Sequence, residues 1–413
     1  VNRATLQEYL NEQKNDVVEE VSSDSGGAAD GGNALDPEKE LREIHERRKD
    51  AANSRYAIVE EYQSSTLSDM AIVKPLGKGS FGNVFLVDNK VTHSRLALKC
   101  LDKSALVDSN QHQYVRREVG ALQNFNHPFI GEYFGVVVSP RKIFFMLEYI
   151  PGGELWSYIY KDGVHGKGVF GGIDALLAAY YGAIVFMAIE HIHTQGYAYR
   201  DLKPENLLIC QNGYLKIVDF GFAKQVPFLN KQGVMSYRTF TLCGTPDYMA
   251  PEVVLTQGHD KSADYWALGV LIYELLCGNT PFEGRNQQRT FEKIVNSQKH
   301  LSFPKKFEPH AKSLLRRLLH PNAALRLGAL QNGGQDVREH AFFTTQNIDF
   351  NKLLHQEIDM SYKPKIVSDA DAPTNGDLDM DDLDLNAEMI ATVDDEYESY
   401  FGDLHLPQST MTM

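Results

Sequence analysis

The sequence predicts an α+β fold, and a few local patterns support this prediction. A glycine-rich segment at 77–82 is followed by β-branched and apolar runs at 83–87 and 96–99, which indicates a hairpin of antiparallel strands. Helical spacing follows at 116–122, and the uncharged stretch 175–189 indicates a buried helix, being shorter than the roughly 18 residues of a membrane span. With 413 residues, the chain is long enough for two or three folded units.

The glycine-rich segment Gly77–Gly82 predicts a phosphate-binding loop, because glycines let backbone N–H groups approach phosphates without a Cβ in the way. A dinucleotide-binding fold would instead need a helix that begins inside this motif. A strand follows, so the loop is predicted to be a hairpin that covers phosphates. Lys99 ends the next strand as their counter-charge, and Glu118 on the following helix is placed to hold that lysine.

A second motif, Arg200–Asn206, is followed by Asp219-Phe220-Gly221. Phosphoryl transfer from a nucleotide needs a group that orients the attacking hydroxyl and cations that neutralise the spreading charge. Asp201 suits the first task, and the side-chain oxygens of Asn206 and Asp219 suit Mg²⁺. A lone Asp-Phe-Gly is more often a turn between strands, but both strings in this order and spacing favour phosphotransfer chemistry.

These motifs resemble those of the eukaryotic protein kinases over about 70–343. The resemblance implies a bilobal protein-kinase fold, with a small antiparallel β-sheet lobe that carries one principal helix and a larger, mainly helical lobe. It also implies that Glu252 pairs with Arg326 and that Asp264 braces the catalytic loop. Tyr199 stands where many kinases have His, and we expect this aromatic side chain to be a hydrophobic support.

Further strings resemble one subgroup, the AGC Ser/Thr kinases. The segment 238–246 and the acidic segment after Phe343 carry that resemblance. Within the group, 152–156, 258–266 and 303–306 most resemble cGMP-dependent protein kinase, and the cAMP-dependent enzyme is the near neighbour.

The resemblance implies that ATP and Mg²⁺ bind between the lobes, with adenine on the connecting segment 148–150. Asp201 is expected to orient the hydroxyl and accept its proton, Lys203 to neutralise the transferring group, and Asn206 and Asp219 to bind Mg²⁺. The implied ATP-binding residues are Leu76, Gly77, Lys78, Gly79, Ser80, Phe81, Gly82, Val84, Ala97, Lys99, Glu148, Ile150 and Leu208.

Two regulatory and substrate features are also implied. Glu154, Glu205 and Glu274 match positions that face arginines of the substrate peptide in related kinases, and the alternative is that Glu154 contacts the ribose and Glu274 is structural. Thr241 matches the activating phosphorylation site, with Arg200 and Lys224 as the phosphate ligands. The alternative for Thr241 is an ordinary exposed loop residue.

The two ends of the chain differ from the kinase-like part. Residues 1–10 are similar to the last strand and closing helix of a cyclic-nucleotide-binding domain, and the alternative is an ordinary amphipathic segment. The first alternative makes 1–20 the remnant of a sensor domain encoded upstream, and 21–69 are predicted to be a linker with a charged helix. The extension 344–413 is acidic: 13 of the 55 acidic residues lie from Ile366 onward, where there is no Lys or Arg. Such runs usually remain partly disordered.

Related kinases brace the small lobe with this tail. Here Asp379–Leu383 lacks the aromatic residues of the family, and Tyr397, Tyr400 and Phe401 match the terminal aromatic pair only loosely. Bracing is therefore not predicted beyond about Lys365.

The four cysteines are scattered without metal-ligand spacing, which fits a reducing compartment, and we expect a cytoplasmic protein. Expected partners are proteins with basic motifs and an upstream or separate cyclic-nucleotide-binding regulator, not nucleic acid. Three hypotheses remain: a cGMP-dependent Ser/Thr kinase, a kinase that answers to cAMP or to no nucleotide, and a pseudokinase scaffold. The scaffold is disfavoured because Lys99, Glu118, Asp201, Asn206 and Asp219 are all present.

Overall fold

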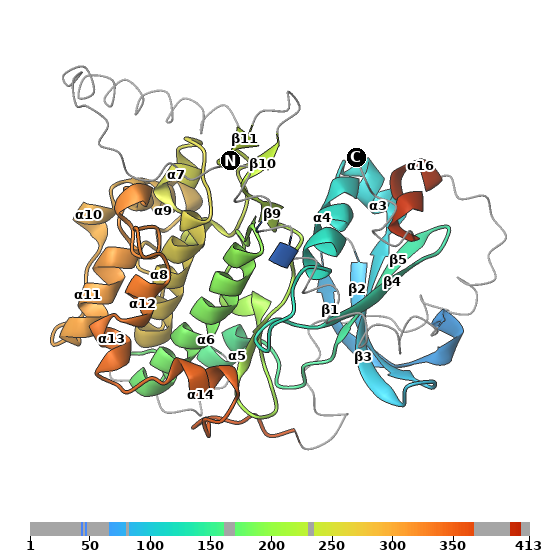
Figure 1. The fold of residues 1–413 in the computed structure, drawn as a ribbon, viewed down its shortest axis with the longest axis horizontal. Helices are drawn as coiled ribbons and strands as arrows, with labels where there is room; N and C mark the ends of the chain where they lie inside the picture. Colours follow the sequence, from blue (N-terminus) through green and yellow to red (C-terminus); the bar gives the residue numbers. More distant parts are fainter. Residues whose placement is uncertain are drawn as a thin grey trace.

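The computed structural model describes residues 43, 46–47, 66–79, 82–160, 170–229, 235–366 and 397–405. Two lobes lie side by side, one built on a β-sheet and the other mainly of helices (Figure 1). The predicted α+β class is confirmed. Several predictions concern residues outside the described ranges: the segment 1–20, the linker with most of its charged helix, Ser80 and Phe81 of the glycine-rich loop, and 367–396 of the tail.

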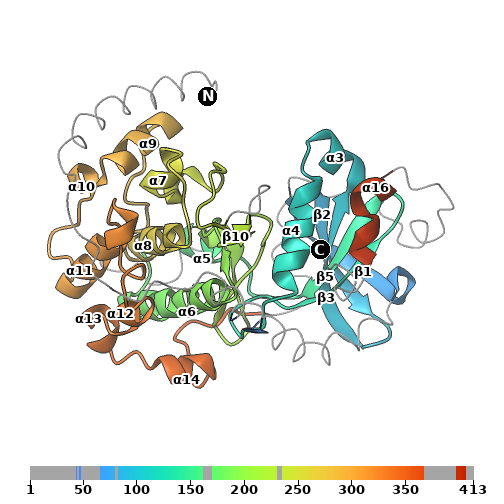
Figure 2. The same ribbon diagram turned by 45° about the horizontal axis from the view of Figure 1, so that its top comes forward.

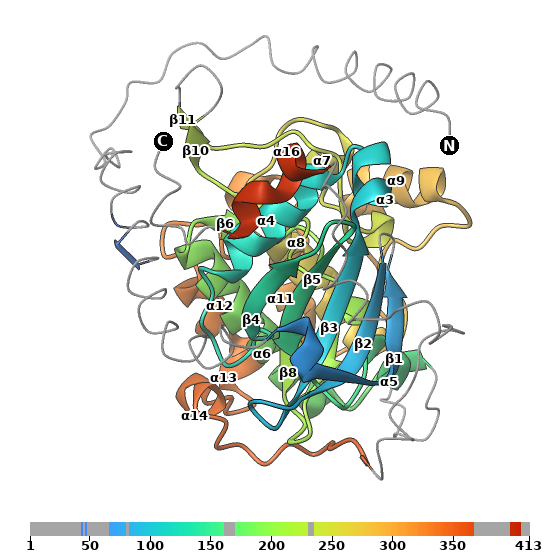
Figure 3. The same cartoon turned by 90° about the vertical axis from the view of Figure 1, so that its right-hand side faces the viewer.

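The small lobe is a five-stranded antiparallel sheet in the order β1-β2-β3-β5-β4 (Figure 3). Its strands are β1 (Met70–Gly79), β2 (Gly82–Asn89), β3 (Ser94–Asp102), β4 (Tyr133–Val138) and β5 (Lys142–Glu148). The glycine-rich segment is the hairpin between β1 and β2, with Gly79 paired to Gly82. Gly82 is required there, because a Cβ would lie 1.8 Å from the carbonyl oxygen of Cys100.

Two helices pack on one face of this sheet, α3 (Lys103–Asp108) and α4 (His112–Leu122) (Figure 1). Helix α4 is the principal helix of the lobe and buries Val115, Val119 and Leu122, which recur at the three- and four-residue spacing of an amphipathic helix. Glu118 lies on the same buried side, 1% exposed. The apolar face of α4 therefore fixes the direction in which this carboxylate points.

The large lobe is organised around α6 (Ala175–Thr194) and α8 (Ser262–Cys277), which are apolar on nearly all sides and therefore buried. Asp174 caps α6 by accepting hydrogen bonds from the backbone N–H groups of Leu176 and Leu177 at 3.1 and 3.0 Å. Among the described residues, α6 alone is long and apolar enough to cross a membrane, but 72% of its apolar window is buried inside the protein, as in the core helix of a soluble domain.

The remaining elements of the large lobe are short. The helices are α5 (Leu155–Tyr160), α7 (Pro251–Val254), α9 (Gln287–Val295), α10 (Ser297–His300), α11 (Pro309–Leu318), α12 (Gln335–Arg338), α13 (Ala341–Thr344) and α14 (Phe350–Leu354). Three two-stranded ribbons accompany them, formed by β6 (Tyr197–Ala198) with β9 (Lys224–Gln225), β7 (Leu207–Ile209) with β8 (Leu215–Ile217), and β10 (Phe228–Leu229) with β11 (Met235–Ser236).

The end of the tail docks on the small lobe, a question that the sequence left open. Helix α16 (Glu398–Phe401) lies beside α4 (Figure 2), where the Arg116 guanidinium donates to the Tyr400 carbonyl at 2.6 Å. Phe401 and Leu404 are buried, at 0% and 8% exposure, and the Nζ atom of Lys103 lies 5.7 Å from the centre of the Phe401 ring. The pair that enters the lobe is thus Phe401 with Leu404, while Tyr400 stays on the surface.

Candidate active site

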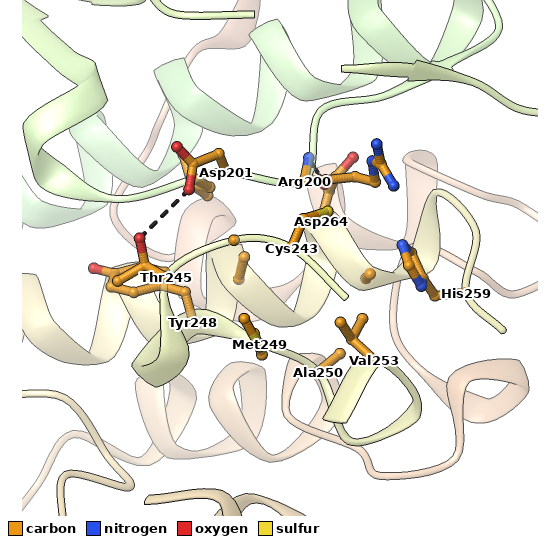
Figure 4. A pocket seen from close by; sticks show the side chains of 14 residues that line it. Arg200, Asp201, Cys243, Thr245, Tyr248, Met249, Ala250, Val253, His259 and Asp264 are labelled. Atoms are coloured by element: carbon orange, nitrogen blue, oxygen red, sulfur yellow. Dashed lines mark hydrogen bonds between the residues drawn. The ribbon is translucent and has the colours of Figure 1, made fainter. Parts of the chain in front are cut away.

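The catalytic loop holds Asp201 in a fixed and buried position. Its Oδ2 atom accepts from Lys203 Nζ at 2.8 Å and from Asn206 Nδ2 at 2.9 Å, and Asn206 also donates to the Asp201 carbonyl at 2.9 Å. The Thr245 hydroxyl donates to Oδ1 at 3.4 Å (Figure 4). Asp201 is 3% exposed, and this burial raises its pKa. The carboxylate is therefore oriented by three donors, and its raised pKa favours proton acceptance.

The backbone beneath this loop is held by Asp264, as the family resemblance implied. Its carboxylate accepts from the backbone N–H groups of Tyr199 and Arg200, both at 2.8 Å, and contacts His193 Nε2 at 2.7 Å. Asp264 belongs to the buried helix α8, so the core of the large lobe fixes the position of the catalytic-loop backbone. Arg200 adopts φ 71°, a left-handed conformation that non-glycine residues keep only where the surroundings enforce it. Tyr199 is fully buried, as its predicted role as a support requires.

The two lobes meet at an ion-pair chain of three side chains. Lys99 on β3 lies 2.6 Å from Glu118 on α4 and 3.7 Å from Asp219, which follows β8. Burial opposes the charge on Lys99, but Asp219 and Glu118 outweigh it and raise the pKa of the lysine. Burial also opposes the charge on Asp219, but Lys99 and a hydrogen bond from Tyr114 lower the pKa of this carboxyl. The lysine is therefore charged and the aspartate ionised at neutral pH.

The donor set beside this chain fits Mg²⁺. Both Nδ2 hydrogen bonds of Asn206 go to Asp201, so the amide oxygen is the atom that Asn206 can offer to a cation. Asp219 supplies a carboxylate whose side chain is 39% exposed. Amide and carboxylate oxygens are hard ligands, and Mg²⁺ usually takes only one or two protein ligands and completes its shell with water and phosphates.

The predicted nucleotide-binding residues come from both lobes. Val84 and Ala97 lie half-buried on the neighbouring strands β2 and β3, and Leu208 lies half-buried on β7 of the large lobe. The connecting segment is anchored at Glu148, whose carboxylate lies 2.6 Å from Lys216 Nζ and accepts from the Glu132 backbone N–H at 3.0 Å. Ile150 is buried. The other described members of the glycine-rich segment are Leu76, Gly77, Lys78 and Gly79 on β1 and Gly82 on β2.

Comparison with known proteins decides the family. The family model described as "Protein kinase domain" matches residues 70–343, which is more than half of the chain. This chain belongs to the protein kinase family. The kinase is 42% identical over 301 residues to a protein from Saccharomyces cerevisiae named cAMP-dependent protein kinase type 3, a match that covers 73% of this chain and 70% of the yeast protein.

Two human relatives extend the comparison. The kinase is 35% identical to the cAMP-dependent protein kinase catalytic subunit PRKX, over 81% of this chain and 88% of the relative. It is 40% identical to cGMP-dependent protein kinase 2, over 69% of this chain but only 35% of that longer protein. The chain is thus a Ser/Thr protein kinase of the AGC group, a family that uses ATP with Mg²⁺, and its neighbours include both cyclic-nucleotide classes.

Glu252, near the end of the segment that begins at Asp219, forms a buried ion pair with Arg326. The Arg326 guanidinium binds Glu252 through two parallel bonds of 2.7 and 2.9 Å and also donates to the Ser262 carbonyl at 2.9 Å. Arg326 is fully buried, and its guanidinium lies 5.3 Å from the Trp266 ring centre. The pair predicted from the resemblance is formed, and it ties α7 to α8 and to the loop after α11.

The acidic residues assigned to substrate differ in their exposure. Glu205 is exposed and Glu154 half-buried, but Glu274 is only 4% exposed. Both carboxylate oxygens of Glu274 accept tyrosine hydroxyls, one from Tyr160 and the other from Tyr248. Tyr160 and Tyr248 therefore hold the Glu274 carboxylate inside the lobe.

The two cations predicted to bind a phosphate on Thr241, Arg200 and Lys224, lie close enough to repel each other. Arg200 Nη1 is buried without a hydrogen-bond partner among the described residues. The pKa of Lys224 is lowered by burial and by repulsion from Arg200 and Arg117, so positive charge accumulates here. Thr241 is exposed, whereas Thr239 is buried and accepts from Lys224 Nζ at 2.7 Å.

Sequence reasoning missed three residues of this site. Thr245 contacts the carboxylate of Asp201, Arg117 adds its charge to that of Arg200 and Lys224, and Tyr114 bonds Asp219. Thr245 lies in the segment 238–246 that carries the AGC resemblance, so its polar side chain was a usable signal. Arg117 and Tyr114 sit on a helix far away in sequence, and no local pattern connects them to the catalytic loop.

Proposed function

We propose that this kinase transfers the γ-phosphoryl group of ATP, in line, to a Ser or Thr hydroxyl preceded by basic residues. The observation that carries the proposal is the position of the Asp201 carboxylate, which is buried and held by Lys203 and Asn206. It lies near Asp219, which belongs to the ion-pair chain in which Lys99 contacts both Glu118 and Asp219. This places a proton acceptor and a group of phosphate and metal ligands together, which is what phosphoryl transfer requires of a protein.

The residue roles follow from chemistry. Asp201 orients the attacking hydroxyl, whose oxygen bonds to the γ-phosphorus as the bond to the β-phosphate oxygen breaks, and the hydroxyl proton passes to Asp201. Lys203, charged and 2.8 Å from Asp201, neutralises the transferring group, and Lys99 holds the α- and β-phosphates. Asn206 and Asp219 would hold Mg²⁺, which shields the phosphate charge when it is bound.

The charge around the catalytic loop supports a preference for basic substrates. Glu205 lies in the loop itself, just before Asn206, and is exposed. Glu154 directly precedes α5, and Glu274 lies on α8. Burial raises the pKa of the Tyr160 hydroxyl, and the negative charges of Glu274, Glu283 and Glu205 raise it further. A guanidinium that reaches the exposed Glu205 or the half-buried Glu154 would form charge-assisted bonds, which are stronger than neutral ones.

Replacement of both arginines of an Arg-Arg-x-Ser peptide by alanine is expected to raise KM by at least about tenfold, because each charge-assisted bond contributes about 1.5–3 kcal/mol. Steady-state kinetics at saturating ATP measure this change. Glu205→Gln should reduce the difference in KM between the two peptides. The control is Glu339→Gln, since Glu339 follows α12 in the same lobe, and it should leave this difference in KM unchanged. Equal efficiency on both peptides would remove this proposal.

We also propose that phosphate on Thr241 activates the kinase. The support is the accumulated charge of Arg200 and Lys224 together with the buried, unpartnered Nη1 of Arg200. A phosphate adds up to two negative charges and three acceptor oxygens. Arg200 precedes Asp201, so a bound phosphate would stabilise the catalytic loop itself.

Thr241→Ala is accordingly expected to lower kcat about tenfold or more, since at least one charge-assisted bond to Arg200 is lost. Ser236→Ala is the matched control, because Ser236 lies in the same segment and donates only to the Arg238 carbonyl. Thr239 is unsuitable as a control, since its buried hydroxyl meets Lys224. Mass spectrometry of active enzyme supplies the second measurement. Unmodified Thr241 together with full turnover of the alanine variant would show that this switch does not exist.

We propose cGMP as the regulator, supported by the resemblance at 152–156, 258–266 and 303–306, with cAMP or no nucleotide as the alternative. Kinase activity measured with added cGMP or cAMP decides the question: activation by cGMP at lower concentration than by cAMP agrees with the proposal, and the reverse order contradicts it. The scattered spacing of the four cysteines in the sequence supports a cytoplasmic site of action, which imaging of the tagged protein tests.

A further inference from the structure

Tyr114 on helix α4 reaches across to the catalytic elements of the large lobe. It lies four residues before Glu118, so the two side chains leave the same face of the helix one turn apart. Its hydroxyl donates to Asp219 Oδ1 at 2.7 Å, over a separation of 105 residues. Helix α4 therefore contacts two members of the ion-pair chain: Glu118 binds Lys99, and Tyr114 binds Asp219.

The Tyr114 ring is fixed by close packing. It meets the Phe222 ring edge-on, with 6.0 Å between centroids and planes at 86°. It also covers Gly221 so closely that a Cβ there would lie 1.7 Å from Tyr114 Cζ. Lys99 Nζ lies 5.6 Å from the ring centre. Gly221 is thus the residue that leaves room for the ring, and the ring has little freedom to move its hydroxyl away from Asp219.

The hydrogen bonds of the Asp219 carboxylate go to one of its two oxygens. Oδ1 accepts from Tyr114 and from the Gly221 backbone N–H at 3.3 Å, and it lies 3.7 Å from Lys99 Nζ. Among the described residues, no hydrogen bond reaches Oδ2. The side chain is nevertheless 39% exposed, and the backbone holds the left-handed φ of 59°. One oxygen is tied inward, and the other is left for a cation.

We propose that Tyr114 is a positioning residue for the metal ion, which it serves by fixing the carboxylate of Asp219 and by linking that carboxylate to helix α4. The inference rests on the proposed role of Asp219 as a ligand. Hydrogen bonds from residues behind a metal ligand orient the ligand, and their loss typically weakens metal binding 10–100-fold. Displacement of α4 would break the Tyr114–Asp219 and Glu118–Lys99 contacts together, so metal affinity depends on the position of this helix.

Tyr114→Phe tests this directly, because it removes the hydroxyl and keeps the ring against Phe222 and Gly221. Mn²⁺ binding to the protein with a non-hydrolysable ATP analogue, followed by electron paramagnetic resonance, should weaken by about tenfold or more. The apparent KM for Mg²⁺ should rise by a similar factor while the KM for peptide stays unchanged. Tyr214→Phe is the control, since the buried Tyr214 hydroxyl donates to the Ile358 carbonyl at 2.9 Å, outside the site.

Asp219→Ala separates this inference from the proposed function. If Asp219→Ala abolishes Mn²⁺ binding but Tyr114→Phe binds Mn²⁺ no more weakly than Tyr214→Phe does, the role of Tyr114 is refuted and the proposed function stands. The role of Tyr114 is also refuted if Tyr114→Phe lowers only the melting temperature. If Asp219→Ala binds Mn²⁺ as the unmodified protein does, the assignment of the metal ligand itself is wrong.

Discussion

Asp201→Asn should lower kcat by about 10²–10⁴-fold, the range expected when a positioned general base is removed. The amide has nearly the shape of the carboxylate, but it neither accepts the hydroxyl proton nor carries the charge that Lys203 pairs with at 2.8 Å. ATP binding should change little, because Lys99 and the proposed metal ligands remain. Single-turnover kinetics and an ATP binding titration measure the two effects separately.

The surface variant Asp88→Asn is the control for this substitution. Asp88 makes an exposed ion pair with Arg95 on the small-lobe sheet, and its loss should leave turnover within experimental error. Turnover of Asp201→Asn near that of Asp88→Asn would mean that Asp201 does not act on the reacting hydroxyl.

Glu252→Ala should lower the free energy of unfolding by about 3–5 kcal/mol, the usual cost of leaving one partner of a buried ion pair alone. Arg326 would keep its charge while fully buried, with only the Ser262 and His320 carbonyls as acceptors. Urea unfolding of the unmodified kinase and of Glu252→Ala measures this difference in the free energy of unfolding. The large loss follows from burial of the remaining charge, not from the number of contacts removed.

Glu292→Ala supplies the comparison for the buried pair. Glu292 pairs with Arg289 one turn away on α9, and both side chains are exposed, so the cost should stay below about 1 kcal/mol. Similar losses in Glu252→Ala and Glu292→Ala would show that burial of Arg326 is not what makes the first pair matter.

The catalytic loop was predictable from sequence because its parts are neighbours in the chain. Asp201, Lys203 and Asn206 are close in sequence, so the hydrogen bonds among them follow from one local turn. The pair Lys99–Glu118 was predicted from the order of the glycine-rich loop, strand and helix, whereas the distant pair Glu252–Arg326 could be foreseen only through the resemblance to kinases. The contact of Tyr114 with Asp219 could not, because it depends on how closely α4 approaches the large lobe.

The tail shows why composition alone was insufficient. Its acidity and its imperfect aromatic pair gave no reason to expect docking, yet Phe401 and Leu404 enter the small lobe and Tyr400 does not. Phe401 is the buried residue of the short helix α16, so the local helical conformation determines which aromatic side chain enters the lobe. In the same way, the buried bridge between Thr239 and His259 determines which threonine meets Lys224, and the motif did not reveal it.

The most direct test of the proposed mechanism is transfer of radiolabelled phosphate from Mg²⁺-ATP to an Arg-Arg-x-Ser peptide by the full chain, with Asp201→Asn measured in parallel. We predict time-dependent label on the peptide serine, first order in enzyme, reduced at least about 100-fold in the variant. Label no greater with the unmodified chain than with Asp201→Asn would contradict the mechanism, since the arrangement around Asp201 would then not be catalytic.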